Sequence, residues 1–271
     1  MANDLTLKPD NIDVPAQPES LAKLGALLAK DDVNLQDVST LIERDMALAA
    51  AVMKAVSSPY YGLRGRVQNV QQATSYLGLR EISALTYEIG LRSVFPDAVE
   101  LKPVWDRAAL RGLIMGRLAS ELFMDAWTAH TAGLFEECGK AVLFKHAPDV
   151  YRGLLHQCAN DVELVQLENH VFGISHDQLG AALCEAWGMS GAAVASVRHH
   201  VHVQAVRQLP PHAPKRGICV LSGLAHALMT DPASVEEVAA ALAPQAMMAQ
   251  ALLVEKAHKV KDKLDDAVAN A

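Results

Sequence analysis

Apolar residues recur every three or four positions along most of this chain, and this spacing constrains the fold more than any other feature. Leu21, Leu24 and Leu28 are spaced in this way, so they share one face of a helix with about 3.6 residues per turn. Nowhere do apolar and polar residues alternate convincingly, as they would in a half-buried strand. Aromatic residues make up only 5% of the chain, so alanine and leucine must do most of the packing. The sequence therefore predicts an all-α fold.

Residues that begin or end helices divide this pattern into segments. Residues suited to cap a helix by accepting backbone N–H hydrogen bonds are Asn34, Asn69, Ser175 and Ser234. Gly78 is suited to end a helix and Pro103 to begin one. The segments expected to be helical are residues 21–28, 34–42, 46–56, 69–78, 80–94, 103–126, 131–146, 148–158, 162–172, 175–187, 190–202, 214–229 and 245–269. Residues 1–17 are expected to form an extended arm.

Charge and hydropathy exclude several functional classes. The formal net charge is -7, the isoelectric point is near 5.9 and no basic cluster dominates, so we do not expect nucleic-acid binding. No apolar run approaches the ~20 residues needed to cross a bilayer. The N-terminus lacks the positive and apolar regions of a secretion signal. We therefore expect a cytoplasmic protein that has no membrane partner.

The cysteines are widely scattered and form no Cys-x-x-Cys pair. They are Cys138, Cys158, Cys184 and Cys219. Each lies in an apolar helical context, so the sequence predicts buried, reduced thiols rather than a disulfide or zinc framework.

The last helical segment is amphipathic. Its apolar positions Leu253, Ala257, Val260 and Leu264 are spaced by four and three residues, and charged residues fill the other faces. Such a helix can dock onto its own domain, which is the simpler interpretation. It can also form a short coiled-coil seam, which would make a homo-oligomer through this helix.

Motifs along the chain resemble one bacterial family. In the first half these are Asp45-Met46-Ala47-Leu48, the segment 56–62 and the helix 70–78, which ends in Leu-Gly. In the second half, residues 133–140 resemble a Gly-Leu-Leu-His-Asp-Ile-Gly-Lys motif. Glu168, Gly173, His176, Trp187-Gly188 and Arg198-His199-His200 follow it in order. Over residues 14–230 the chain thus resembles the HDOD family, the HD-related output domain of bacterial signalling proteins.

The resemblance implies a two-lobed multi-helix bundle. It places an N-terminal helical lobe at residues 14–100, a lobe related to HD phosphohydrolases at residues 101–230 and a helical tail at residues 231–271. It also implies a regulatory role in signal transduction. The expected partner is a protein of a signalling pathway, or a small ligand in the cleft between the lobes.

The resemblance also implies where a metal cage would lie. HD enzymes hold divalent ions with one histidine, a His-Asp pair and a later aspartate, and the ions activate water. The matching positions here are Arg107, then Glu136 and Glu137, and last the neighbourhood of Ser222 and Gly223. Arginine offers no lone pair, and neither serine nor glycine replaces a carboxylate. We therefore expect a catalytically inactive domain with no metal and no cofactor.

The alternative is a divergent HD-type, metal-dependent phosphohydrolase that acts on a nucleotide or another phosphoester. Glutamates bind hard cations, and His176, His199 and His200 could add imidazole ligands to a makeshift site. Stoichiometric iron or manganese together with phosphoesterase turnover would favour this alternative.

A sharper hypothesis concerns Arg107. Its guanidinium could pair with Glu136 or Glu137 and neutralise these carboxylates without a metal ion. An Arg107 side chain that points into solvent, far from both glutamates, would contradict the predicted ion pair.

Other residues have a structural and a functional interpretation. His199 and His200 could form a ligand or sensor site, but a surface position is the simpler expectation. Glu168 and His176 could form a polar link between helices. Trp105 and Trp187 are expected in the core rather than as stacking platforms, and Tyr60 and Tyr61 are expected to plug the N-terminal bundle or contact a partner.

Overall fold

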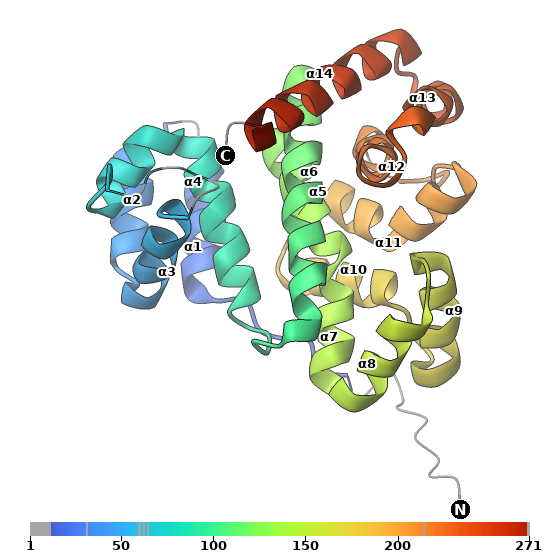
Figure 1. Cartoon of the computed structure of the whole chain (residues 1–271), viewed down its shortest axis with the longest axis horizontal. Coiled ribbons are helices and arrows are strands. Elements are labelled where there is room, and N and C mark those ends of the chain that lie inside the picture. The colour runs from blue at the N-terminus through green and yellow to red at the C-terminus, as the bar shows by residue number, and fades with distance from the viewer. Residues whose placement is uncertain are drawn as a thin grey trace, which may run out of the picture. The chain divides into compact units, whose positions relative to one another are not determined.

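The structure, a computed structural model, describes residues 12–30, 32–58, 61, 63, 65–213 and 215–269, with side chains as far as residue 266. Every regular element in these residues is a helix, which confirms the all-α prediction (Figure 1). The expected arm up to Asn11 lies outside the described residues, as do Pro59, Tyr60 and Gly62 of the turn after the third helix.

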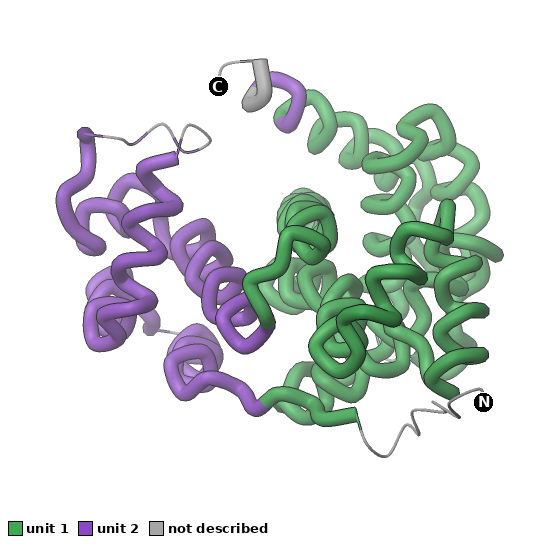
Figure 2. Tube along the Cα trace, turned by 60° about the horizontal axis from the view of Figure 1, so that its bottom comes forward, with its two compact units in different colours: residues 1–15, 96–263 green, residues 16–95, 264–271 purple. Residues whose placement is uncertain are grey.

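The chain divides into two compact units (Figure 2). The small unit contains residues 16–95 and 264–271, and the large unit contains residues 1–15 and 96–263. The first segment of the small unit ends at residue 95, whereas the N-terminal lobe was expected to end at residue 100. Residues 231–263, which were expected to form a separate tail, group with the large unit.

The small unit is built from α1 (Glu19–Leu28), α2 (Leu35–Glu43), α3 (Met46–Val56) and α4 (Val70–Arg92). Asn34 and Asn69 cap α2 and α4 as predicted, because their side chains accept hydrogen bonds from the third backbone N–H beyond them. Gly78 interrupts α4 with a φ of 78° and a ψ of 167°, so the helix breaks where the sequence predicts. Buried apolar side chains such as Leu21, Ile42 and Val52 form the core.

The large unit contains the remaining helices, except that residues 264–269 at the end of the last helix group with the small unit. They are α5 (Lys102–Glu121), α6 (Ala126–Glu136), α7 (Cys138–His146), α8 (Pro148–Gln157), α9 (Asp161–Phe172), α10 (His176–Ala186), α11 (Gly191–Val206), α12 (Gly217–Thr230), α13 (Val235–Leu242) and α14 (Gln250–Ala269). Short 3₁₀ turns lie at Val99–Leu101, Pro232–Ser234 and Pro244–Ala246. The predicted capping box of Ser175 and Gln178 opens α10.

Three expectations about these helices are wrong. The segment 103–126 does not stay helical to its end, because Phe123 adopts a left-handed φ of 55° and Asp125 caps a new helix. The segment 131–146 is two helices, and the chain bends at Glu137 between them. Ser234 does not cap α13, because it lies in a 3₁₀ turn and its hydroxyl donates to the Asp231 carbonyl.

Two glycines allow the close helix packing that positions the candidate site. A Cβ at Gly139 would lie 1.8 Å from the carbonyl oxygen of His176, so α7 and α10 meet backbone to backbone. A Cβ at Gly133 would lie 2.7 Å from the Cα of Gly112, so α6 and α5 also meet backbone to backbone. Both glycines belong to the motif at residues 133–140.

The C-terminal helix docks onto the large unit through residues 250–263. Leu253, Ala257 and Val260 are fully buried, and Lys259 and Lys263 form ion pairs with Glu121 of α5 at 2.6 and 2.8 Å. The simpler interpretation is thereby confirmed for these three positions, and a homo-oligomer through α14 stays a prediction. None of the described helices is both long and apolar enough to span a membrane.

Aromatic and cysteine side chains lie largely where the sequence places them. Trp105 and Trp187 are buried, and the Trp187 Nε1 donates to the Pro15 carbonyl at 2.8 Å. All four cysteines are free thiols, of which Cys158 alone is only half-buried.

Candidate functional site

Two adjacent glutamates at the bend between α6 and α7 lie at the centre of a buried charge cluster. Glu136 and Glu137 are both fully buried. The guanidinium of Arg111, from α5, donates to Glu136 Oε2 at 3.1 Å and to Glu137 Oε1 at 3.2 Å. This fork resembles the bidentate pairing that makes arginine an effective partner for buried carboxylates.

Arg107 joins the same cluster from one turn earlier in α5. Its guanidinium donates to Glu137 Oε2 at 3.1 Å, although 46% of the side chain is exposed. The predicted pairing of Arg107 with a glutamate is therefore confirmed. The more buried Arg111 was not among the predicted site residues, although it lies four residues after Arg107 and therefore on the same helix face.

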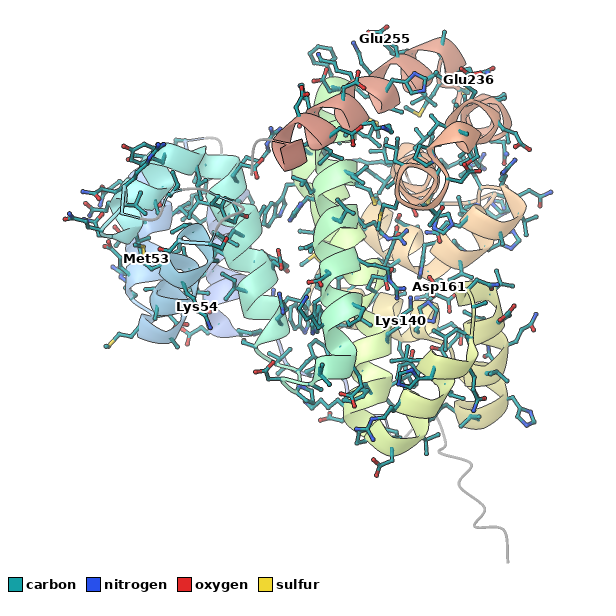
Figure 3. All side chains as sticks on the ribbon, viewed as in Figure 1. Met53, Lys54, Lys140, Asp161, Glu236 and Glu255 are labelled. Carbon is teal, nitrogen blue, oxygen red and sulfur yellow. The ribbon has the colours of Figure 1, made fainter. Side chains whose placement is uncertain are left out.

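Lys140 links this cluster to α9. Its ammonium group is fully buried and donates to Glu137 Oε2 at 2.8 Å and to Asp161 Oδ1 at 2.7 Å. Figure 3 labels both Lys140 and Asp161, which lie near each other on α7 and α9. We call Arg107, Arg111, Glu136, Glu137 and Lys140 the ion-pair cluster.

The pKa values of the two glutamates shift in opposite directions. Burial raises the pKa of Glu136 to about 7, because Arg111 and the hydroxyls of Ser222 and Ser196 only partly offset the loss of water. Burial also acts to raise the pKa of Glu137, but Lys140, Arg111 and Arg107 outweigh it and lower the pKa to about 2. Glu137 is therefore the anionic centre of the cluster at neutral pH.

A second buried cluster lies beside the first. Glu168 of α9 accepts a hydrogen bond from the Tyr151 hydroxyl at 2.5 Å, and its other oxygen lies 2.7 Å from His176 Nδ1. The same oxygen accepts the backbone N–H of His176 at 2.8 Å. The predicted polar link between Glu168 and His176 is thus confirmed, and it fixes the imidazole at the start of α10.

His200 of α11 faces His176, with their ring centroids 5.4 Å apart. Its Nδ1 lies 2.7 Å from the Val197 carbonyl, which can only accept a hydrogen bond, so Nδ1 carries the proton. Burial lowers the pKa of His200 well below its usual value. The expected surface position is therefore wrong for His200, because tight packing of α10 on α11 turns it inward. Its neighbour His199 is half-buried.

Asp161, His176 and His200 together form a group of potential metal ligands, and we call these three the imidazole cluster. One ligand atom from each lies within 4.8 Å of the other two. Both histidines are fully buried, and 20% of the Asp161 side chain is exposed. Both histidines are candidate ligands in the sequence, but no sequence motif points to Asp161, since only the fold brings the start of α9 to them.

The positions that match the HD metal cage do not fit a metal ion. Arg107 occupies the first position and pairs with Glu137. Cations or hydroxyls already contact the oxygens of Glu136 and Glu137. At the last position Ser222 is buried and hydrogen-bonded to Glu136. A cation placed there would have to displace three positive side chains.

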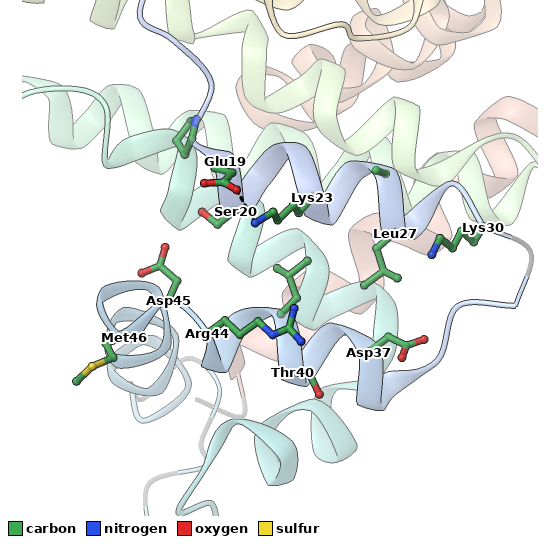
Figure 4. A pocket seen from close by; sticks show the side chains of 13 residues that line it. Glu19, Ser20, Lys23, Leu27, Lys30, Asp37, Thr40, Arg44, Asp45 and Met46 are labelled. Carbon is green, nitrogen blue, oxygen red and sulfur yellow. Dashed lines mark ion pairs between the residues drawn. The ribbon is translucent and has the colours of Figure 1, made fainter.

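A separate hollow lies on the small unit, where α1 faces α2 and the start of α3 (Figure 4). Charged side chains of both signs line it, including Lys23, Arg44 and Asp45. An exposed ion pair joins Glu19 to Lys23. The hollow holds no buried, unpaired group among the residues that line it.

The fold is that of an HD-related domain, in which other side chains stand at the positions where HD enzymes have metal-binding histidine and aspartate residues. Residues 14–203 match the HDOD domain, and the chain belongs to this family. The predicted resemblance is confirmed.

Relatives are distant. An uncharacterized protein of Treponema pallidum (strain Nichols) is 27% identical over 222 residues, which are 80% of this chain and 42% of that protein. This chain therefore spans less than half the length of that relative.

Solved structures share the fold. A candidate signal transduction protein of Marinobacter aquaeolei VT8 has a TM-score of 0.74 at 22% identity, over 96% of this chain and 59% of that chain. A candidate phosphohydrolase of Shewanella amazonensis SB2B has a TM-score of 0.66 at 19% identity, over 94% of each chain. At these identities the two structures establish the fold alone.

Proposed function

We propose that this chain is a non-catalytic regulatory module of bacterial signalling that acts by binding a protein partner or a small ligand. The ion-pair cluster is the observation that carries the proposal. In the place where an HD enzyme would hold ions, Arg107, Arg111 and Lys140 supply the positive charge instead. Side chains that neutralise one another leave no Lewis acid to activate water.

The known relatives support the regulatory part of the proposal. The family is the HDOD domain, and the Marinobacter structure is described as that of a candidate signal transduction protein. A buried ion-pair network fixes geometry more than it adds net stability. Such a network suits a module whose task is to hold a shape that a partner recognises.

Turnover assays test the non-catalytic part. The purified chain, loaded in turn with Mn²⁺, Fe²⁺ and Zn²⁺, is incubated with an activated phosphodiester and with mononucleotides. We expect no turnover above that of the free ions. Metal-dependent turnover that Asp161→Asn abolishes and Glu185→Gln preserves would overturn the proposal, because Asp161 belongs to the group of potential metal ligands whereas Glu185 is exposed and lies outside it.

Affinity capture tests the binding part. The full chain is used as bait in a lysate of the native organism, and metal content is measured on the same sample. Each retained protein is then purified and titrated into the chain by calorimetry. Saturable binding of a signalling protein supports the proposal, and a bait with metal-dependent turnover but no saturable partner contradicts it.

The divergent HD phosphohydrolase remains the second candidate. The imidazole cluster favours it, because two histidines and a carboxylate are a ligand set that catalytic metal sites use. The candidate phosphohydrolase from Shewanella shares this fold. The turnover assays above separate the two functions.

A further inference from the structure

Two helix ends of the large unit carry large apolar side chains where glycine is the usual residue. Phe123 follows α5 and Met247 follows the 3₁₀ turn Pro244–Ala246, and both have a left-handed φ of 55°. This conformation is costly for residues with a side chain, so helices that end in it mostly use glycine. The two residues are 98% and 96% exposed, so neither adds to the core. A contact with another molecule would explain why a costly conformation presents apolar groups to water.

An apolar hollow lies beside these two helix ends. Met124, Ile218 and Met247 line it, and its volume is about 750 Å³, which is within the range of pockets that hold a bound group. Methionine side chains adapt to the shape of what they contact. Every lining residue that the structure describes belongs to the large unit, so the hollow does not depend on how the two units are placed.

The charged side chains at the hollow are mostly positive. Lys215 and Arg216 line it, and neither pairs with a carboxylate of the described residues. The Arg216 guanidinium donates to backbone carbonyls, which carry no net charge. The one carboxylate among the described lining residues, Asp125, accepts hydrogen bonds from the N–H and the hydroxyl of Thr128. The hollow therefore keeps a positive edge in a chain whose formal net charge is -7.

Gln245 holds the backbone around the hollow in place. Its side-chain oxygen accepts the Leu209 N–H at 2.8 Å, and its side-chain nitrogen donates to the Arg207 carbonyl at 2.9 Å. Its own backbone carbonyl accepts a hydrogen bond from Arg216 at 3.1 Å. A surface that is ordered before binding loses less conformational entropy when a partner docks.

We propose that this hollow binds a short acidic segment of a protein partner, in which a carboxylate lies next to an aromatic or leucine side chain. The apolar side chain fills the hollow against Met124 and Met247, and Phe123 packs on the segment from the rim. The carboxylate pairs with Lys215 and Arg216, which the charge of the edge favours. The inference rests on the proposed function, because it names the surface and the chemistry through which a regulatory module meets its partner.

Peptide selection tests the chemistry. A phage library of random peptides is selected on the immobilised full chain, and the most enriched peptide is synthesised with a fluorescent label. We expect enriched sequences to place an aspartate or glutamate beside a phenylalanine, tryptophan or leucine. Binding followed by fluorescence anisotropy should saturate, and it should weaken as salt rises because charges at an exposed edge are screened.

Variants assign the surface. Phe123→Gly should weaken binding of the selected peptide by at least ~30-fold, as the loss of a large interface side chain does. The same variant should keep or raise the Tm, because glycine suits the left-handed φ. A purely structural role for Phe123 predicts a lower Tm instead. Lys215→Glu should weaken binding by about 10-fold, because it reverses a charge at the edge.

Val99→Ala and Lys54→Glu are the matched controls. Val99 is 79% exposed and lies just before α5, whose 20 residues span about 30 Å and end beside Phe123. Lys54 is exposed on α3 of the small unit, where Figure 3 labels it. Both variants should bind the selected peptide as the parent does.

Three results would contradict this inference. The selection could enrich no acidic and apolar sequence, or the selected peptide could bind Phe123→Gly and Lys215→Glu as it binds the parent. The parent could also dimerise in sedimentation experiments while Phe123→Gly stays monomeric, and a second copy would then occupy the hollow.

Failure of this inference differs from failure of the proposed function. A captured signalling protein that binds the parent and Phe123→Gly equally would keep the regulatory role and exclude this hollow as its surface. Metal-dependent turnover in the assays above would overturn the proposed function whatever the peptide does.

Discussion

The ion-pair cluster and the imidazole cluster are neighbours in the large unit, joined by Lys140. They differ in how fully their buried polar atoms are partnered within the protein. Glu137, at the centre of the ion-pair cluster, forms ion pairs with three cationic side chains. His176 and His200, in the second, each keep one nitrogen without a partner among the described residues. The contrast shows that two adjacent buried clusters can differ in how fully their polar atoms find partners within the protein.

Removal of the central charge of the ion-pair cluster should have the largest effect. Glu137→Gln leaves Arg111 and Lys140 buried with too little negative charge, which typically costs about 3–5 kcal/mol of unfolding free energy. Urea unfolding measures the loss. The exposed Glu185→Gln should change the unfolding free energy by less than about 0.5 kcal/mol. A small loss in Glu137→Gln would show that water reaches the cluster.

The pH dependence of stability should separate Glu136 from Glu137. The folded state raises the pKa of Glu136 from 4.5 to about 7, so the stability it contributes is present below pH 4.5 and is lost as the pH rises to about 7. The loss is on the order of 3 kcal/mol. Glu137, with a pKa of about 2, acts oppositely, and its contribution is lost as the pH falls from 4.5 towards 2.

The variant Glu136→Gln checks this assignment. Chemical unfolding from pH 2 to pH 8 should show a flatter dependence of the unfolding free energy on pH above pH 4.5 in the variant, while the loss below pH 4.5 that Glu137 produces persists. An unchanged slope between pH 4.5 and pH 7 would contradict the raised pKa of Glu136.

The spacing between α7 and α10 should tolerate no added methyl group. Gly139→Ala places a Cβ 1.8 Å from the His176 carbonyl oxygen, and overpacking of this kind costs about 1–3 kcal/mol. The matched variant is Gly153→Ala in α8, where nothing lies within 4 Å of the added carbon. Thermal unfolding should show a lower Tm for the first variant and an equal or higher Tm for the second.

Arg107→Ala should have the smallest effect. Arg107 is 46% exposed, and Glu137 keeps Arg111 and Lys140 without it. Partly exposed ion pairs contribute about 0–1 kcal/mol, so urea unfolding should show a loss in that range. A loss as large as that of Glu137→Gln would make Arg107 a core member of the cluster.

The sequence predicts the local features well because they depend on neighbouring residues. The caps at Asn34 and Asn69 and the break at Gly78 need only a few residues of chain. The partners of the clusters depend on which helices meet, so the roles of Arg111 and Lys140 and the buried position of His200 could not be predicted from the sequence.

Pairing between Arg107 and Glu137 could be predicted for a different reason. A cationic side chain and two carboxylates replace the ligands of a known cage, and the shared fold keeps those positions together. Asp161 has no counterpart among those cage positions. Only the packing of α9 beside α10 brings it to the histidines.

The positions of the tryptophans have a spectroscopic consequence. One of them, Trp187, donates its indole N–H to the Pro15 carbonyl. Residues 16–95 are an insertion between two segments of the large unit, and this bond tethers the chain just before the insertion begins. All three tryptophans of the sequence, at positions 105, 127 and 187, lie in the large unit. Indole emission therefore reports on that unit alone, whereas far-ultraviolet circular dichroism reports on helices of both. A loss of circular-dichroism signal at temperatures where the indole emission is still native would show the insertion unfolding while the large unit stays folded.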